Sequence, residues 1–413
     1  MGVLELADDL WNGRITTAEH HPLYRASDLE EVADGVHFMS VMSNVVLIDA
    51  GSLLAMVDTG TQFTAEHVHA AVRRVSDAPL RAAVFSHGHI DHVFGVGPFD
   101  AEVARDGRPR PEVVGHEAMP ARFERYRMTA GYNGIINRRQ FGIDGLQWPT
   151  DYRIPDTTYR DGMTVDVGDI ALELHHDRGE TDDHTWTWIP DRGVLCTGDL
   201  FIWATPNCGN PQKVQRYPLE WAAALRKMAA LPAELLLPGH GVPVAGADRV
   251  NQGLTDTAEY LESLVEQTLA LMNDGRRLND ILHEVVPPAG LADRPYLQPV
   301  YDEPEFIVRN IWRLYGGWYD GNPAHLQPAR EVDLASEVAG LAGGAAVLAR
   351  RAAELSAAGD HRLAADLAEH ARLAAPEDAE VLAAHAEVFA AFRDAATSTM
   401  AKGIYGAAST DPP

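Results

Sequence analysis

The chain has 413 residues, of which 46% are hydrophobic and 23% are charged. This length predicts two or three domains, and the apolar fraction is sufficient for at least one large core. Acidic residues outnumber basic ones by 60 to 34, which gives a formal charge of −26. Such a charge argues against nucleic acid or an anionic membrane surface as the partner, because both attract basic proteins. An anionic substrate would have to be attracted by a metal or by a local group of arginines.

The two cysteines, Cys196 and Cys208, are too few for a disulfide framework or for a metal site made of cysteines alone. The N-terminus has no basic segment followed by an apolar run, and the chain has no stretch of about 18 apolar residues. We therefore expect neither a signal peptide nor a membrane-spanning helix, and we expect a cytoplasmic protein.

Short apolar strands alternate with polar loops and a few helices between about residues 35 and 245. The clearest strand candidates are 45–50, 53–60, 82–86, 164–174, 185–195 and 235–240. A helix is expected over 64–75. This mixture of strands and helices, with several hairpins, indicates a layered α/β domain.

The composition changes after about residue 250. Residues 256–274 predict an amphipathic helix, and the stretch 287–328 is rich in proline and aromatic residues. From Val332 onward alanine dominates, and the predicted helices are broken at 359–360 and at 376–378. A second, helical region therefore follows the α/β domain.

The most informative motif is Ser86-His87-Gly88-His89-Ile90-Asp91-His92, directly after an apolar strand. A tight loop at a strand end can aim His87 and His89 at one point, and Asp91 and His92 at a second. Imidazole and carboxylate groups are the ligands of a zinc-type site. The alternative is a surface loop that happens to be rich in histidine, but so many ligand-type residues within one loop favour a metal site.

Further ligands are expected at the ends of later strands. Asp199 has the character of a bridging carboxylate, His240 follows the last strand, and Glu180 takes the remaining position. Histidines 175, 176 and 184 are the alternatives to Glu180. Asp58 is expected to shape the site through hydrogen bonds to the ligand loop.

Three motifs together resemble the metallo-β-lactamase superfamily: His-x-His-x-Asp-His at 87–92, Gly-Asp at 198–199 and Gly-His at 239–240. The resemblance implies an αββα sandwich with a one- or two-metal site on its edge. Most members have a histidine where Glu180 stands. The alkylsulfatase family inside the superfamily has a glutamate there, and the separation of 19 residues between Glu180 and Asp199 fits that family.

A second resemblance lies in the helical region. The run Gly-Trp-Tyr-Asp-Gly-Asn-Pro at 317–323 is similar to the alkylsulfatase dimerisation domain, and 357–360 and 375–380 continue the match. The two resemblances cover about residues 35–400. They imply a homodimer with an N-terminal extension (1–34), a catalytic domain (35–250), an all-α dimerisation domain (251–402) and a flexible tail (403–413). We expect the sterol-carrier-like domain of longer members to be absent, which argues against long-chain surfactant substrates.

The resemblance also implies the chemistry, which is cleavage of a sulfate ester by metal-bound hydroxide at a site with two zinc ions. His87, His89 and Glu180 would hold one metal, and Asp91, His92 and His240 the other. Asp199 and the water would bridge them, so that Asp91 and Asp199 are the catalytic carboxylates.

A sulfate ester also needs cationic or hydrogen-bonding groups to hold its oxygens. Candidates are Tyr132, Asn133, Asn137 and Arg138, in an expected loop between the motif strands, and Lys213 and Arg216 after Asp199. The family usually has a Leu-Arg-Gly-Ala run in this second loop, where residues 209–216 differ, so Lys213 or Arg216 would have to replace its arginine. The alternative for each candidate is a solvated surface residue.

Three other functions fit parts of this pattern. The same site would serve a hydrolase of a carboxylic ester, lactone, thioester or phosphoester. A single-iron oxygenase on this fold would leave Asp91 and His240 without a metal. A non-catalytic assembly protein would use the helical region to bind a partner, but the complete ligand set argues against it.

Overall fold

The computed structural model describes residues 1–21 and 27–410, and the chain divides into two compact units. The first unit contains residues 1–130, 149–274 and 281–315, and the second contains 131–148, 275–280 and 316–413. The division at residue 250 suggested by the sequence remains a prediction.

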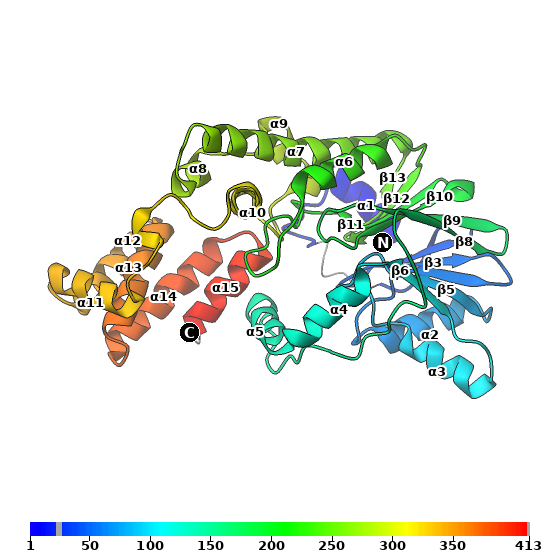
Figure 1. Cartoon of the computed structure of the whole chain (residues 1–413), viewed down its shortest axis with the longest axis horizontal. Coiled ribbons are helices and arrows are strands. Elements are labelled where there is room, and N and C mark those ends of the chain that lie inside the picture. Colours follow the sequence, from blue (N-terminus) through cyan, green and yellow to red (C-terminus); the bar gives the residue numbers. More distant parts are fainter. Residues whose placement is uncertain (22–26, 411–413) are drawn as a thin grey trace. The chain divides into compact units, whose positions relative to one another are not determined.

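Two β-sheets with helices on both outer sides make up the centre of the first unit (Figure 1). The seven-stranded sheet has the order β1-β2-β3-β4-β5-β6-β7, antiparallel as far as β4 and parallel beyond it. Its strands are β1 (Glu30–Ala33), β2 (Val36–Met39), β3 (Val45–Asp49), β4 (Leu54–Val57), β5 (Leu80–Val84), β6 (Glu112–His116) and β7 (Thr157–Tyr159).

The six-stranded sheet has the order β13-β12-β11-β10-β9-β8, with only the β11–β12 pair parallel. Its strands are β8 (Gly162–Val167), β9 (Ile170–His176), β10 (Thr185–Ile189), β11 (Val194–Ile202), β12 (Leu235–His240) and β13 (Val244–Ala245). The αββα sandwich expected from the sequence is confirmed, and the strand candidates fall on observed strands.

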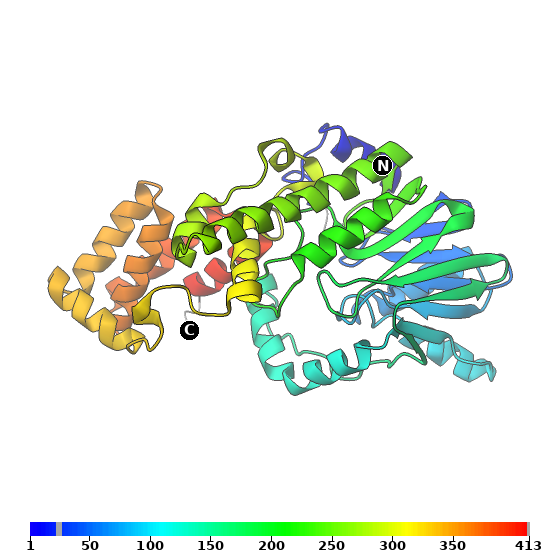
Figure 2. The same ribbon diagram turned by 45° about the horizontal axis from the view of Figure 1, so that its top comes forward.

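The helices of the first unit cover the outer faces of the two sheets. On the first sheet lie α2 (Ala65–Val75) and α3 (Gly97–Asp106), and on the second lie α6 (Pro218–Ala229) and α7 (Ala247–Asn273), which run side by side (Figure 2). The remaining helices are α1 (Val3–Trp11), α4 (Met119–Met128), α9 (Ala289–Ala292) and α10 (Pro304–Gly316), with the part of α8 (Leu278–Glu284) that begins at Ile281.

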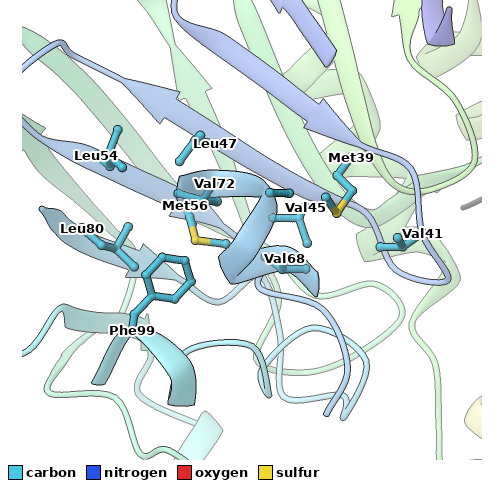
Figure 3. Packing of buried hydrophobic residues seen from close by; sticks show 11 residues of the cluster. Met39, Val41, Val45, Leu47, Leu54, Met56, Val68, Val72, Leu80 and Phe99 are labelled. Atoms are coloured by element: carbon cyan, nitrogen blue, oxygen red, sulfur yellow. The ribbon is translucent and has the colours of Figure 1, made fainter. Parts of the chain in front are cut away.

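The core beneath the first sheet joins three elements (Figure 3). Val68 and Val72 from α2 and Phe99 from α3 pack against apolar side chains of the sheet, among them Leu47 and Met56. All five side chains are essentially inaccessible to solvent. The burial of these apolar side chains is the main contribution that holds α2 and α3 on the first sheet. It also holds β5 in place, and the end of β5 carries the histidine-rich loop.

The second unit is helical. Besides α5 (Ala130–Phe141) it contains α11 (Glu331–Ala342), α12 (Ala345–Ala357), α13 (His361–Ala374), α14 (Ala379–Ala395) and α15 (Thr399–Thr410). Gly403 of α15 allows close approach to α5, because a Cβ atom on it would lie 2.2 Å from the carbonyl oxygen of Gln140. The breaks predicted at 359–360 and 376–378 are confirmed, and Asp378 caps α14 by accepting hydrogen bonds from two backbone N–H groups.

Residues 403–410, predicted as part of a flexible tail, continue α15, and 411–413 lie outside the described residues. Among the described helices, none by itself has both the length and the apolar character to cross a membrane. Joined end to end, α11 and α12 pass that test of length and composition, although they meet at an angle of 86°.

Candidate metal centre

Four segments from the two sheets converge at one edge of the sandwich. The loop 86–92 follows β5, Asp199 lies within β11, His240 ends β12, and Glu180 lies in the connection between β9 and β10. Among the described residues, the ligand-type side chains form two groups: His87, His89, Glu180 and Asp199, and Asp91, His92 and His240.

In the first group, three side chains point at one spot. His87 Nε2 lies 2.7 Å from His89 Nδ1 and 3.2 Å from Glu180 Oε2, and His89 Nδ1 lies 3.3 Å from the same glutamate oxygen. Two ligands about 2.1 Å from one tetrahedral ion lie about 3.4 Å apart, so this spacing suits a shared cation.

The second group has similar spacing. His240 Nε2 lies 3.4 Å and His92 Nε2 3.6 Å from Asp91 Oδ2. Asp199 reaches both groups, since its Oδ1 lies 3.4 Å from His92 Nε2 and its Oδ2 lies 3.3 Å from His240 Nε2 and 3.8 Å from His87 Nε2.

The donor atoms fit a metal better than they fit one another. Glu180 Oε2, Asp199 Oδ1 and His92 Nε2 are buried and have no hydrogen-bond partner among the residues that the structure describes. Buried polar atoms without partners are costly, and these three lie within the two groups. The chemistry of these residues therefore fits a divalent metal.

Asp58 supports this arrangement from behind the ligands. Its Oδ1 accepts a hydrogen bond from Ser86 N at 2.7 Å, and its Oδ2 accepts from the Ser86 hydroxyl at 2.8 Å. His92 Nδ1 donates to Asp58 Oδ2 at 2.7 Å, which leaves Nε2 to face the group. Asp58 has a φ of 56°, a left-handed conformation that an aspartate adopts at some cost in strain.

Two glycines allow close packing around Asp199, Gly239 against its carboxylate and Gly198 against His184. A Cβ atom on Gly239 would lie 2.1 Å from Asp199 Oδ1, and one on Gly198 would lie 2.7 Å from His184 Nε2. Gly198 also has a φ of 50° and sits where the β11–β12 register shifts. Glycine at both positions therefore allows the two parallel strands to bring their ends to the shared carboxylate.

The carboxylates of the centre are charged in the folded chain. Burial alone would raise the pKa of Asp199, but His240 and His92 outweigh it and hold that pKa well below its usual range. For Glu180, burial is likewise outweighed, here by His89 and Arg216, and its pKa is also lowered. Burial lowers the pKa of His89 to about 4, so its imidazole is neutral and able to act as a ligand.

A buried arginine occupies the far side of Glu180. Arg216 Nη2 lies 3.3 Å from Glu180 Oε1, which also accepts a hydrogen bond from the Asn207 amide. Arg216 is 1% exposed, and within the described part of the chain its Nε and Nη1 atoms have no hydrogen-bond partner. One glutamate oxygen is thus held by the protein, and the other is directed at His87 and His89.

The comparisons with known proteins agree with this geometry. Residues 40–240 match the model of the metallo-beta-lactamase superfamily, and residues 277–411 match that of alkyl sulfatase dimerisation. The chain combines a metallo-beta-lactamase domain with an alkyl sulfatase dimerisation domain.

Curated relatives include two Pseudomonas proteins. One is a linear primary-alkylsulfatase from Pseudomonas sp. (strain ATCC 19151), 28% identical over 347 residues, which are 79% of this chain and 65% of the relative. The other is an (R)-specific secondary-alkylsulfatase from Pseudomonas sp., 28% identical over 374 residues, which are 84% of this chain and 56% of the relative. The chain therefore spans less than two thirds of the length of either relative.

A solved structure shows the same fold. The stereoselective inverting sec-alkylsulfatase Pisa1 from Pseudomonas sp. superposes with a TM-score of 0.83 at 23% sequence identity. The match covers 94% of this chain and 66% of that one.

The residues predicted to bind substrate fall into two sets. Lys213 and Arg216 lie in the metallo-beta-lactamase domain, on the segment between β11 and α6, with Lys213 half-buried. The other set lies in the second unit on α5, which is a helix rather than the predicted loop: Tyr132, Asn133, Asn137 and Arg138. No proline interrupts the segment from Ala130 to Phe141, so its backbone can form a continuous helix.

On α5, Tyr132 and Arg138 are exposed, and Asn133 and Asn137 are buried. The Asn137 amide donates to the Asn133 carbonyl within the helix. A role in substrate binding stays a prediction for all four.

The three histidines considered as alternatives to Glu180 have other neighbours. His175 stacks on Trp186, and His176 stacks on His116 with ring centroids 3.6 Å apart. His184 stacks on His87 at 4.7 Å, and its Nε2 lies 3.2 Å from the Thr197 carbonyl oxygen. Within the described residues, the first group contains Glu180 and none of these histidines.

Sequence reasoning missed several residues that support the centre. Asp183 Oδ2 accepts a hydrogen bond from Gly88 N at 3.0 Å, and its other oxygen lies 2.8 Å from Arg122 Nε. The ion pair thereby fixes the backbone between His87 and His89. The only sequence signal for Asp183 is its place three residues after Glu180. The sequence gives no signal for Arg122, because it lies on a helix that contains several arginines.

Asn310 of α10 is a second residue of this kind. Its Oδ1 accepts from Arg216 N at 3.2 Å, and its Nδ2 donates to Arg216 O at 3.1 Å. The two residues are 94 positions apart, so no local pattern relates them.

Proposed function

We propose that the protein is a metal-dependent hydrolase that cleaves the sulfate ester of a small organic alcohol at a centre of two zinc ions. The observation that carries this proposal is the pair of ligand groups sharing Asp199, with the buried guanidinium of Arg216 touching Glu180. The names of the two Pseudomonas relatives, both alkylsulfatases, support the substrate class.

Bound zinc would polarise an oxygen of the ester and lower the pKa of a bound water molecule toward neutral pH. The chain's own residues would do the rest. Asp91 is partly exposed, with its Oδ2 beside His240, and we assign to it the orientation of the attacking water. Asp199 would hold the two ligand groups at a fixed distance from each other through contacts to His87, His92 and His240.

Lys213 and Arg216 would hold the anionic sulfate. The Arg216 atoms Nε and Nη1 are buried donors without a partner in residues 1–21 and 27–410, which suits the oxygens of a bound anion. Burial and the neighbouring Arg216 lower the pKa of Lys213 to about 8, so its ammonium group is mostly charged at neutral pH.

The test is sulfate release from protein purified without added metal or chelator, with short and medium-chain alkyl sulfates compared with matched carboxylic esters, lactones, thioesters and phosphoesters. Metal content is measured on the same sample. We expect sulfate release with about two zinc ions per chain, the number that a two-metal hydrolytic site holds. Two zinc ions with turnover of the other esters alone would reject the sulfate ester as substrate, and a single iron would reject the zinc hydrolase.

A variant pair separates substrate binding from general effects. Lys213→Gln should raise KM for the alkyl sulfate more than for the carboxylic ester, because only the sulfate carries a charge. Lys227→Gln is the matched control, since Lys227 is exposed and pairs with Asp177 on the surface. Equal changes of KM for both substrates in Lys213→Gln would remove Lys213 from the substrate site.

The homodimer and the cytoplasmic location also belong to this proposal. The match to a dimerisation domain supports the first. Cell fractionation with an antibody to the chain would test the second.

A further inference from the structure

We infer that the two metal positions differ in affinity, and that Arg216 makes the position of His87, His89 and Glu180 the weaker one. This inference rests on the metal centre of the proposed function, but not on the substrate. The basis is an asymmetry in the residues that stand directly behind the ligands.

The first group has a positive charge against its own carboxylate. Arg216 Nη2 lies 3.3 Å from Glu180 Oε1, and the guanidinium is almost completely shielded from solvent. A cation entering beside His87 and His89 would be repelled by this charge with little screening by water or salt. Arg216 and Asn207 also occupy Glu180 Oε1, so only Oε2 remains for a metal.

The second group has a negative charge behind one of its histidines. Asp58 Oδ2 lies 2.7 Å from His92 Nδ1, and a carboxylate in this position makes the imidazole a stronger ligand. Asp58 approaches the first group only indirectly, through the Ser86 hydroxyl, which lies 2.9 Å from His87 Nδ1. Asp91 gives the second group its own carboxylate.

Other charges nearby do not reverse the difference. Asp199 contacts both groups. Lys213 interacts electrostatically with Asp91 as well as with Glu180, so it acts on both positions. Asp183, next to the first group, is paired with Arg122, whose charge offsets it.

The consequence is loading in two steps. The first equivalent of metal would fill the position of Asp91, His92 and His240, and the second would fill the position of His87, His89 and Glu180. At metal concentrations between the two dissociation constants, each chain would then hold one metal ion. The second ion would bind only at higher metal concentration.

The test is a titration of metal-free protein with Zn²⁺ in competition with a chromophoric chelator, followed without any substrate. We expect two classes of site whose affinities differ by about tenfold or more. His240→Ala should remove the tight class and His89→Ala the weak class. Two equal classes, or loss of the tight class in His89→Ala, would overturn the inference.

Arg216→Met removes the charge while keeping much of the side-chain volume. We expect it to tighten the weak class by about tenfold or more and to leave the tight class unchanged, whereas Arg216→Lys should keep the difference. Arg313→Met is the matched control, because Arg313 contacts Gln215 and Asn310 but not Glu180. An unchanged weak class in a folded Arg216→Met protein would exclude Arg216 as the cause, and if this variant fails to fold, the two ligand variants still decide the order of loading.

The outcomes separate this inference from the proposed function. Sulfate release by a protein with two equal classes would reject the inference alone. Unequal classes without sulfate release would reject the proposed substrate alone. A protein that binds no zinc would reject both.

Discussion

Gly239 allows the shared carboxylate to lie directly against the end of β12. An added Cβ atom would lie 2.1 Å from Asp199 Oδ1 and 2.8 Å from the carbonyl carbon of Gly198, which is backbone and yields little. We therefore expect Gly239→Ala to destabilise the fold by about 1–3 kcal/mol and to reduce zinc binding, because Asp199 must move. Denaturant unfolding and metal analysis measure the two effects. Gly97→Ala is the control, since no atom lies near its Cβ position.

Lys213 gives the centre a pH dependence of its own. Its pKa of about 8 means that the ammonium group loses its proton as the pH rises through that value. We expect KM for an alkyl sulfate to rise by about tenfold from neutral to alkaline pH, while KM for a neutral carboxylic ester changes much less. In Lys213→Arg, which stays charged, this rise should be absent. A wild-type ratio of the two KM values that does not vary with pH would contradict the assignment.

The lowered pKa of Lys213 also makes the stability of the fold depend on pH, and here the charged form is the unfavourable one. The pKa of Lys213 is lower in the folded chain than the ordinary lysine value of 10.5, so folding disfavours the charged form. This cost is complete below about pH 8 and is relieved as the pH rises toward the unfolded value. Lys213→Met should therefore be stabilised relative to the wild type below that pH and lose the advantage above it.

At the scale of elements, α10 holds the segment that carries Arg216. Asn310 makes two hydrogen bonds to the Arg216 backbone and accepts a third from Gln215 Nε2 at 2.8 Å. Asp302, just before the helix, accepts from Gly209 N at 2.6 Å. Residues 209–216 are thus attached to α10 at both ends.

Removal of the Asn310 side chain tests this attachment. Asn310→Ala leaves the buried Arg216 N–H without its acceptor and removes one of the two donors to the Arg216 carbonyl oxygen, which keeps its hydrogen bond from Gln215 Nε2. We expect the substitution to lower the free energy of unfolding by about 1–3 kcal/mol. It should also raise KM for the sulfate ester, because Arg216 is released. The matched control is Asn251→Ala, an exposed asparagine that makes one hydrogen bond to Ala229, where the change should stay within about 0.5 kcal/mol.

How far the sequence alone predicts the centre depends on how local each pattern is. His87, His89, Asp91 and His92 lie within one loop, and their grouping can be read directly. Glu180, lying in a connecting loop, is placed only through the resemblance to a known family. The roles of Asn207 and Asn310 are set by contacts between distant segments, and asparagine is too common on protein surfaces to indicate them.

The same reasoning explains the errors at the level of elements. The helix predicted over 256–274 begins at Ala247, because its first turns carry polar residues that blur the apolar stripe. The resemblance to the family predicts a loop around Tyr132, but this segment contains no proline and forms α5.

For the whole molecule, the assembly can be tested on the second unit. Leu341 is 89% exposed and Leu334 50% exposed on α11, while Ala335 and Ala339 face its core. Two copies with a formal charge of −26 repel each other, so an apolar surface is the more favourable contact. We expect a molar mass in light scattering of about twice the 45.0 kDa of one chain.

Substitution at that surface should reverse the association. Leu334→Glu combined with Leu341→Glu is expected to give a monomer that still binds zinc, since both residues lie outside the first unit. Leu219→Glu on α6, also an exposed leucine, should leave the mass unchanged. A dimer that persists in the double variant would place the interface elsewhere.

The position of α10 determines where this chain can be joined to the helical domain of a relative in a chimaera. The alkyl sulfatase dimerisation match begins at residue 277, yet α10 through Tyr315 folds with the metallo-beta-lactamase domain. A chimaera joined at residue 276 would therefore replace Asn310 along with the helical domain, and the borrowed helix would have to fit the foreign Arg216 segment. A chimaera joined after Tyr315 would keep the native pair. The junction that preserves the centre thus lies about 40 residues after the start of the alkyl sulfatase dimerisation match.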